Sequence, residues 1–176
     1  HTSDWHLGRG LHGVDLGDAQ QHVLSQVVAA VSTHDVDAVL IAGDVFDRAV
    51  PPVTSVRLWA SALRELSSLV PVIVIPGNHD SAIRLGVGAD LYREGVHIVA
   101  DPSQVGTPVE LRDAHGSVLV YPIPFLDPDM TRHVLGTDGE VLDRSHEAVM
   151  SAAMRRVRAD LARRRSVDPA ARSVVM

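Results

Sequence analysis

The hydrophobic positions of the N-terminal part alternate between a helical pattern and a buried-strand pattern. Residues 19–33 carry apolar side chains at a spacing of three or four, and Asp18 just before them predicts an N-cap. Residues 38–42 are an unbroken apolar run, which is typical of a strand buried on both faces. The apolar stripe of the predicted helix is formed by Leu24, Val27, Val28 and Val31.

The same alternation continues along the chain. Residues 49–69 predict a second helix, with Pro52 near its start, where a missing N–H costs little. Residues 70–75 predict a second buried strand that ends in a polar loop, and residues 96–100 predict a short third strand. The stripe of the second helix is formed by Val56, Trp59, Leu63 and Leu66.

The C-terminal part predicts two strands, a long helix and a last strand. Residues 109–125 read as two strands joined by a turn at 113–116. Residues 145–165 predict a long helix, and residues 172–176 start another strand. Helices that alternate with buried strands predict an α/β layered fold, with β-sheets flanked by helices. The apolar face of the long helix is formed by Met150, Met154, Val157 and Leu161.

Composition narrows the class of protein. The 176 residues are 45% hydrophobic and carry a net charge of -6, which excludes a generally basic nucleic-acid-binding surface. There is no cysteine, so disulfides and thiolate metal sites are excluded, and a cytoplasmic location is expected. No apolar run is long enough to span a membrane. We expect one domain over residues 1–176, cut short at its C-terminal side, because the chain starts at His1 without a Met and stops inside an apolar run.

Three polar clusters follow predicted strands, and we expect them to meet. The carboxyl ends of strands in open α/β sheets are where ligands bind. Carboxylate, imidazole and amide groups together suit Mn, Fe or Zn, whereas sets of oxygen atoms alone suit Mg or Ca. The clusters are Asp4 with His6, Asp44 with Asp47, and Asn78 with His79 and Asp80.

The spacing within the clusters supports metal binding. Asp4 and His6 are two apart, so in an extended chain both side chains point the same way. The two oxygens of Asp44 could bridge two ions roughly 3.5–4 Å apart. Gly43 and Gly77 would let the backbone turn sharply at the strand ends.

Each cluster also has a plain structural interpretation. Asp4 could cap a turn, and Asp44 with Asp47 could form an Asx turn. The "GNHD" stretch at 77–80 is more specific, because a turn does not require a histidine after an asparagine. The three clusters in this order, each at a strand end, favour one joint metal site over three separate turns.

The motifs "DWH", "GDVFD" and "GNHD" resemble the first three signatures of the calcineurin-like metallophosphoesterases. The longer stretches "LIAGDVFDRAVPP", "PVIVIPGNHDS" and "YPIPF" resemble the branch of this family that processes DNA double-strand breaks, over about the first 130 residues. This resemblance implies exonuclease or endonuclease hydrolysis of DNA with two divalent ions, Mn²⁺. It also implies a homodimer and an SbcC-type ATPase as partner.

The resemblance implies a role for each motif residue. Asp4 and His6 would hold the first ion, Asp44 would bridge both ions, and Asn78 would bind the second. His79 would not be a ligand but would protonate or stabilise the leaving group.

Other residues would support this centre. Asp80 would orient His79, a task that suits a carboxylate, and Asp47 would at most support a ligand. Three arginines close to the motifs could contact the DNA backbone, or could equally be solvated surface residues: Arg9, Arg48 and Arg84.

The sequence departs from the family pattern after the third motif. An isolated histidine ligand and a later Gly-His-x-His pair do not appear, and we expect them beyond Met176, so this chain should hold the second ion poorly. The remaining histidines read as ordinary surface or turn residues: His97, His115, His133 and His146.

Three further interpretations stay open at this point. The chain could act on nucleotides, lipids or phosphoproteins with the same metal site, or it could be a catalytically incomplete module for assembly. The arginine-rich segment 155–165 could bind DNA or a partner, but a solvated helix face is the favoured interpretation.

Overall fold

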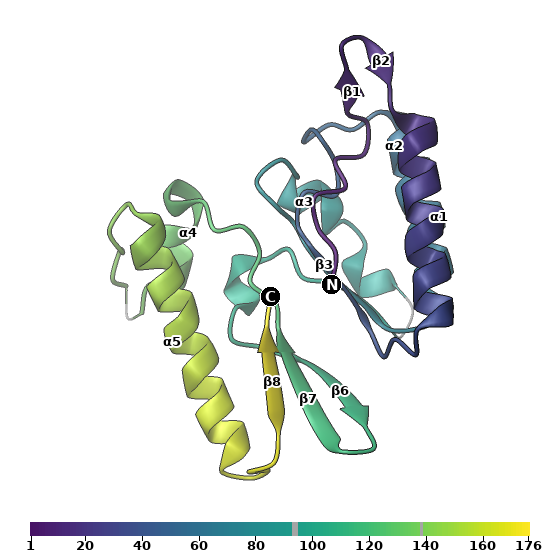
Figure 1. The fold of residues 1–176 in the computed structure, drawn as a ribbon. Helices are drawn as coiled ribbons and strands as arrows, with labels where there is room; N and C mark the ends of the chain where they lie inside the picture. Colours follow the sequence, from purple (N-terminus) through teal and green to yellow (C-terminus); the bar gives the residue numbers. More distant parts are fainter. Residues whose placement is uncertain (93–94, 138) are drawn as a thin grey trace. The chain divides into compact units, whose positions relative to one another are not determined.

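The computed structural model describes residues 1–92, 95–137 and 139–176. The chain divides into two compact units, residues 1–100 and residues 101–176 (Figure 1). Each unit has its own three-stranded sheet and its own buried core. The predicted α/β fold class is confirmed. One catalytic domain can contain two such units, so the single domain over residues 1–176 stays a prediction.

The first unit is built on a parallel sheet with the strand order β3-β4-β5. Its strands are β3 (Val39–Ala42), β4 (Val72–Ile75) and β5 (Val96–Ile98). The central strand β4 is buried at every position, which explains why it appears in the sequence as a continuous apolar run. The three predicted strands are therefore confirmed, with ends shortened by one or two residues. His97 lies half-buried on β5 and is not the surface residue that we expected.

Two helices of the first unit pack against each other, α1 (Gly17–Thr33) and α2 (Val53–Ser67). Asp18 lies in the first turn of α1, where its charge complements the helix dipole, but the cap position is Leu16 and has no side-chain cap. The predicted cap at Asp18 is therefore wrong. In α2, Val56 is 43% exposed, so the predicted stripe is correct only for its other members: Trp59, Leu63 and Leu66.

The N-terminal segment runs parallel to β3 and continues into an unpredicted hairpin. Isolated bridges join Thr2 to Ile41 and Leu7 to Phe46. Strands β1 (Gly10–Leu11) and β2 (Val14–Asp15) then pair antiparallel and project beyond the start of α1 (Figure 1). Both turn residues between them have positive φ, +50° at His12 and +81° at Gly13, as tight hairpins with two-residue turns require.

Two short helices, also unpredicted, follow the third motif. Helix α3 (Ala82–Leu85) is capped by the Ser81 side chain, which accepts a hydrogen bond from the Arg84 N–H. The 3-10 helix η1 (Ala89–Leu91) comes next. These turns carry the chain from the end of β4 towards β5.

The second unit has a mixed sheet with the order β6-β7-β8. Strands β6 (Val109–Asp113) and β7 (Gly116–Tyr121) form the predicted hairpin, and β8 (Arg172–Val175) runs parallel to β7, as Figure 1 shows. The 3-10 helix η2 (Pro102–Gln104) precedes this sheet. Helix α4 (Pro128–Leu135) was not predicted, although Asp127 as N-cap followed by proline is a recognisable helix start.

Helix α5 (His146–Arg165) covers the second core. It begins after Ser145, whose side chain accepts a hydrogen bond from the Ala148 N–H. The predicted face is partly wrong, because Met150 is 45% exposed and the buried face is shifted by one residue. That face contains small side chains that let the helix pack closely: Val149, Ala152, Ala153 and Val157.

A polar network ties α5 to the sheet. The buried Tyr121 hydroxyl donates to Asp160 Oδ2 over 3.0 Å, and Arg164 Nε donates to the same oxygen over 2.6 Å. Burial first, and then this hydrogen bond, raise the pKa of Tyr121 to about 12. Burial on its own raises the pKa of Asp160, but the hydrogen bonds from Arg163, Arg164 and Tyr121 outweigh it and lower the pKa.

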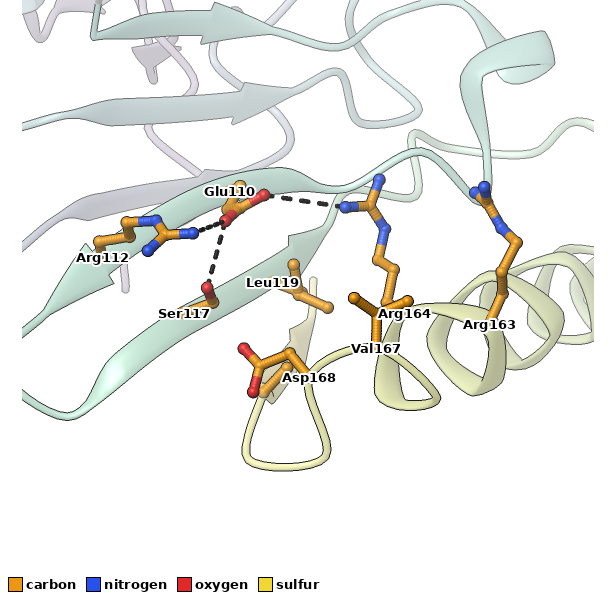
Figure 2. A pocket seen from close by; sticks show the side chains of 9 residues that line it. Glu110, Arg112, Ser117, Leu119, Arg163, Arg164, Val167 and Asp168 are labelled. Atoms are coloured by element: carbon orange, nitrogen blue, oxygen red, sulfur yellow. Dashed lines mark hydrogen bonds and ion pairs between the residues drawn. The ribbon is translucent and has the colours of Figure 1, made fainter.

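The arginine-rich segment is therefore partly structural. Arg156 and Arg165 donate to the carbonyls of Val134 and Ala171. Figure 2 shows Glu110 between two further arginines, with Arg112 at 3.1 Å and Arg164 at 3.8 Å, beside a shallow pocket of about 350 Å³. The expected solvated face holds for part of the segment only, because several of its arginines close contacts within the second unit.

No helix among the described residues combines the length and the apolar character that crossing a membrane requires.

Candidate metal centre

Two adjacent strands of the first sheet, β3 and β4, end side by side and lead into the second and third motifs. Ala42 pairs with Ile75, and the next residues are Gly43 and Pro76. The two loops then touch backbone to backbone. A Cβ on Gly77 would lie 2.1 Å from Asp44 Oδ1, and a Cβ on Gly43 would lie 2.9 Å from the Gly77 Cα. Gly43 also has φ +88°, as a sharp turn requires, whereas Gly77 is needed for the close approach.

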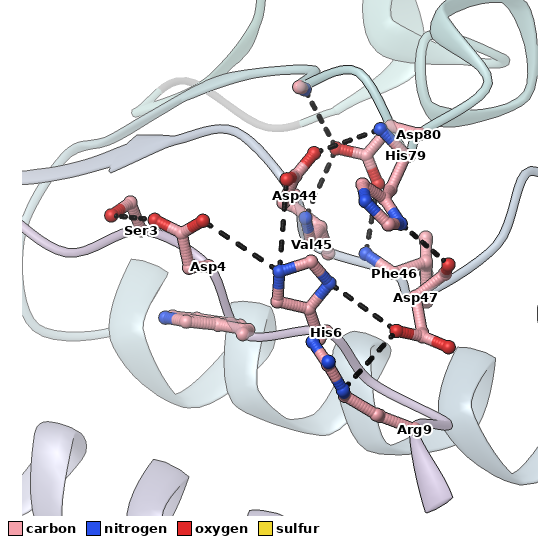
Figure 3. A network of polar contacts seen from close by, with 12 residues as sticks. Ser3, Asp4, His6, Arg9, Asp44, Val45, Phe46, Asp47, His79 and Asp80 are labelled. Atoms are coloured by element: carbon pink, nitrogen blue, oxygen red, sulfur yellow. Dashed lines mark hydrogen bonds and ion pairs between the residues drawn. The ribbon is translucent and has the colours of Figure 1, made fainter.

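Side chains from all three motifs converge at this edge. His6, Asp44 and His79 each offer an atom within 4.8 Å of the others. His6 Nε2 lies 3.7 Å from Asp4 Oδ1 and 3.8 Å from Asp44 Oδ2 (Figure 3). The other oxygen of Asp44 accepts a hydrogen bond from the His79 N–H at 3.0 Å, so this buried carboxylate contacts the first and third motifs.

These distances fit a bound ion better than they fit hydrogen bonds. Separations of 3.7 and 3.8 Å are too long for an N–H···O bond. Two atoms that each lie roughly 2.0–2.2 Å from one ion are at most about 4.4 Å apart. The donor set, imidazole with carboxylates, suits Mn, Fe or Zn. The residues present therefore fit a transition-metal ion.

The backbone brings Asp4 and His6 together in a different way from the one that the sequence predicts. Their φ angles are +57° and +43°, and Asp44 has φ +50°, so the segment is left-handed and not extended. The N–H groups of Asp4 and His6 donate to the carbonyls of Gly43 and Asp44 at 3.1 and 2.9 Å. Left-handed non-glycine residues cost about 1–3 kcal/mol each and concentrate at functional sites. The extended-chain argument is therefore wrong, although both side chains do face the same point.

Asp47 supports His6. Its Oδ1 lies 3.5 Å from the Nδ1 of that ring, which is buried and has no hydrogen-bond partner within the described part of the chain. A carboxylate behind the second nitrogen of a ligand histidine fixes the ring and raises its basicity. Arg9 and Arg48 approach the same carboxylate at 4.0 and 3.8 Å.

Asp80 connects the two motif loops. Its carboxylate accepts hydrogen bonds from the backbone N–H groups of Gly77 at 2.9 Å, Val45 at 3.1 Å and Phe46 at 2.9 Å. We expected Asp80 to orient the His79 ring, but that ring contacts the Asp47 carbonyl instead, with Nδ1 at 3.0 Å. Asp80 therefore aligns the loop that carries Asp44 with the loop that carries His79.

His79 is exposed and lies close to His6. The two ring centroids are 4.8 Å apart, and the rings are nearly perpendicular. The carbonyl of Asp47 is the main cause that raises the pKa of His79, partial burial opposes it, and the charge of Asp44 raises it further. Asn78 beside it is also exposed, and its role as a ligand stays a prediction.

Two residues outside the motifs hold the site, and neither role was predicted from the sequence. Trp59 of α2 packs edge-on against Trp5 at 5.8 Å and against Phe46 at 6.3 Å, so it anchors the first and second motifs to the core. The low aromatic content, 3%, was a signal that each aromatic side chain has a specific place. The other residue is Gln20 of α1, whose side-chain amide binds the backbone of the first motif.

Comparison with known proteins identifies the class. Residues 1–135 match the family described as calcineurin-like phosphoesterase, and the chain belongs to this family. Over 150 residues, or 83% of its length, the chain is 33% identical to SbcD, the smaller-lettered component of the nuclease SbcCD of Bacillus subtilis (strain 168). It spans 38% of the length of that relative. The resemblance seen in the three motifs is thereby confirmed.

Proposed function

We propose that this chain forms the metal centre of a Mn²⁺-dependent nuclease that hydrolyses DNA phosphodiesters during double-strand-break processing. The observation that carries the proposal is the convergence of His6, Asp44 and His79 at the ends of β3 and β4. Family membership supports phosphoester chemistry, and the relative named as part of a nuclease supports DNA as substrate.

Four residues would hold the ions. Asp4 and His6 bind the first, Asp44 is shared, and Asn78 binds the second. When bound, two such ions supply a hydroxide nucleophile at neutral pH and neutralise charge on the phosphoryl oxygens. Asp47 keeps the His6 ring in place from behind, and Asp80 keeps the spacing between the Asp44 and His79 loops.

His79 would give a proton to the leaving 3′ oxygen. Its Nδ1–H donates to the Asp47 carbonyl, which leaves Nε2 to carry the proton that is transferred. The raised pKa increases the protonated fraction near neutral pH, as a general acid needs. Because the ring is exposed, substrate can reach it.

The arginines around the motifs are proposed contacts to the DNA backbone. Arg9 and Arg48 extend over Asp47 at the rim of the site, and their remaining donors can bind phosphate oxygens. Arg84 follows the third motif and lines a small apolar cavity of about 260 Å³ with Phe46, Trp59 and Tyr92. Bound ions would offset the acidic charge of the ligands themselves.

We also propose that the protein works in the cytoplasm as a homodimer with an SbcC-type ATPase. The relative is one part of a two-component nuclease, which supports the partner. Exposed apolar side chains after the second and third motifs support a dimer contact: Val50, Val53, Ile83, Val87 and Leu91. Light scattering coupled to size exclusion tests the dimer, and Val53→Asp with Ile83→Asp should shift it to monomer.

The test of the function is cleavage of linear duplex and single-stranded DNA by the full-length protein, with and without Mn²⁺. Asp44→Asn is the control that removes the shared ligand and keeps its shape. Mn²⁺-dependent cleavage that Asp44→Asn lacks supports the nuclease. Hydrolysis of a small phosphodiester without cleavage of DNA moves the substrate to another phosphoester, and activity against neither substrate favours an assembly module.

A further inference from the structure

Gln20 holds the backbone of the first motif from a different element. It lies in the first turns of α1, 14 residues after His6. Its Nε2 donates to the His6 carbonyl over 2.7 Å and approaches the Trp5 carbonyl at 3.4 Å. Its Oε1 accepts a hydrogen bond from the Gly8 N–H at 3.1 Å. One side-chain amide therefore contacts three residues of this motif.

The segment that Gln20 binds needs such support. Asp4, His6 and Gly8 all have positive φ, at +57°, +43° and +91°. Left-handed residues of this kind persist only where the surroundings determine them. Backbone bonds to the second motif hold the segment on one side, from His6 to Asp44 and from Leu7 to Val45, both at 2.9 Å. Gln20 holds it from the side of α1.

The chemistry of the contact requires an amide. The His6 carbonyl needs a donor, while the Gly8 N–H needs an acceptor. Glutamine and asparagine carry both in one group, whereas glutamate carries acceptors only when ionised. The Arg9 N–H donates to the same His6 carbonyl at 3.0 Å, so the two donors together satisfy that oxygen.

We propose that Gln20 is a positioning residue for the metal centre, which fixes the His6 backbone and so sets the affinity for the first ion. The inference rests on the proposed function, because it takes His6 to be a metal ligand. Residues that support ligands in this way change metal affinity by about 10–100-fold when they are replaced.

The first measurement needs no metal. Amide hydrogen exchange of the metal-free, full-length protein compares Gln20→Met, which keeps the length and loses the amide, with Gln21→Met. Gln21 is the exposed neighbour on the same helix and serves as the matched control. We expect faster exchange at Gly8 and Leu7 in Gln20→Met only, with unchanged exchange at Val74 of β4. Equal exchange in the two variants would overturn the clamp.

The second measurement is Mn²⁺ affinity, read from the electron paramagnetic resonance signal of free Mn²⁺. We expect binding about 10-fold weaker in Gln20→Met. Gln20→Glu should lose more, because a carboxylate oxygen would face the His6 carbonyl oxygen. Cleavage at saturating Mn²⁺ should stay near the parental kcat, since the clamp touches no substrate. A merely destabilising substitution would lower the melting temperature without moving the Mn²⁺ constant.

The failures of the two proposals are distinguishable. Equal affinity in Gln20→Met and Gln21→Met, beside a clear loss in Asp44→Asn, would overturn the role of Gln20 and leave the metal centre in place. Unchanged affinity in Asp44→Asn would overturn the metal centre itself, and with it the role of Gln20 in metal binding.

Discussion

The two units of this chain use their polar side chains in opposite ways. In the second unit, Tyr121, Asp160 and Arg164 are joined by hydrogen bonds of 2.6 and 3.0 Å that fix α5 to its sheet. In the first unit, His6 faces the carboxylates of Asp4 and Asp44 at 3.7 and 3.8 Å, on a left-handed backbone. Closed hydrogen bonds stabilise a fold, whereas facing donors that do not close leave coordination positions for a ligand. The strain and the open contacts coincide in the unit that carries the motifs.

The sharpest test of this comparison is Asp44→Asn. We expect DNA cleavage and Mn²⁺ affinity to fall by more than about 100-fold, beyond the range of residues that only support a ligand. The melting temperature of the metal-free protein should change little, because the amide keeps an oxygen for the His79 N–H. Titration calorimetry with Mn²⁺ and a thermal melt measure the two effects. A large loss of metal-free stability would make Asp44 a structural residue like Asp160.

His79→Ala separates proton transfer from metal binding. We expect kcat to fall by about 10²–10⁴-fold, the usual contribution of a general acid. Mn²⁺ affinity should stay within a few-fold, because His79 is proposed to face the leaving group. Single-turnover cleavage at saturating Mn²⁺ measures the first effect. A parallel loss of Mn²⁺ binding would make His79 a ligand, as its closeness to His6 and Asp44 also permits.

Asp80→Ala should damage the first unit in stability as well as in activity. It removes the acceptor of three backbone N–H groups, from Gly77, Val45 and Phe46. We expect the free energy of unfolding to drop by about 2–4 kcal/mol, since each hydrogen bond to a charged group contributes about 1.5–3 kcal/mol and such bonds are not additive. Urea unfolding measures it, and Asp80→Asn, which keeps part of the acceptor capacity, should lose less.

Tyr121→Phe is the matching change in the second unit. It removes the hydroxyl that donates to Asp160 and keeps the ring, so we expect a loss of about 0.5–1.5 kcal/mol. Mn²⁺ affinity and kcat should equal those of the parent. A shift in either would mean that the network of the second unit supports the metal centre as well as its own core.

The smallest expected effect is on the pH dependence of stability. Burial lowers the pKa of His97 below its ordinary value of about 6.5. The unfolded chain therefore takes up this proton more readily, so the contribution of neutral His97 is complete above about pH 6.5 and is lost as pH falls through the folded pKa. Melting temperatures between pH 7.5 and pH 5 should decline less in His97→Gln. Identical slopes would show that other groups cause the decline.

The elements that could be predicted are those whose own residues determine them. Strand β4 is apolar at every position because both faces are buried, and Ser145 marks the start of α5 by its capping side chain. Val56 and Met150 were misplaced because their exposure depends on the partner element, which the helical period alone does not give. The same holds for α4, which is short and weakly apolar.

The candidate site was predictable in its residues but not in its contacts. Strand ends and residue chemistry indicated Asp4, His6, Asp44 and His79, and the structure brings them together. The left-handed backbone of His6 arises from hydrogen bonds to another loop, so a local extended-chain argument fails. Gln20 is likewise determined by the way α1 packs beside the first motif, and no local pattern marks it.

The backbone contact between Gly43 and Gly77 has a consequence for variation. Because no side chain lies between the two loops, no rotamer can move aside to accept a larger residue, and even a methyl group at Gly77 would meet Asp44 at 2.1 Å. In a saturation library selected for DNA cleavage, these two positions should be as intolerant as the ligands, although neither glycine offers a side-chain atom to an ion. The smallest residues of the motifs thus set the boundary of the sequences that this centre can explore.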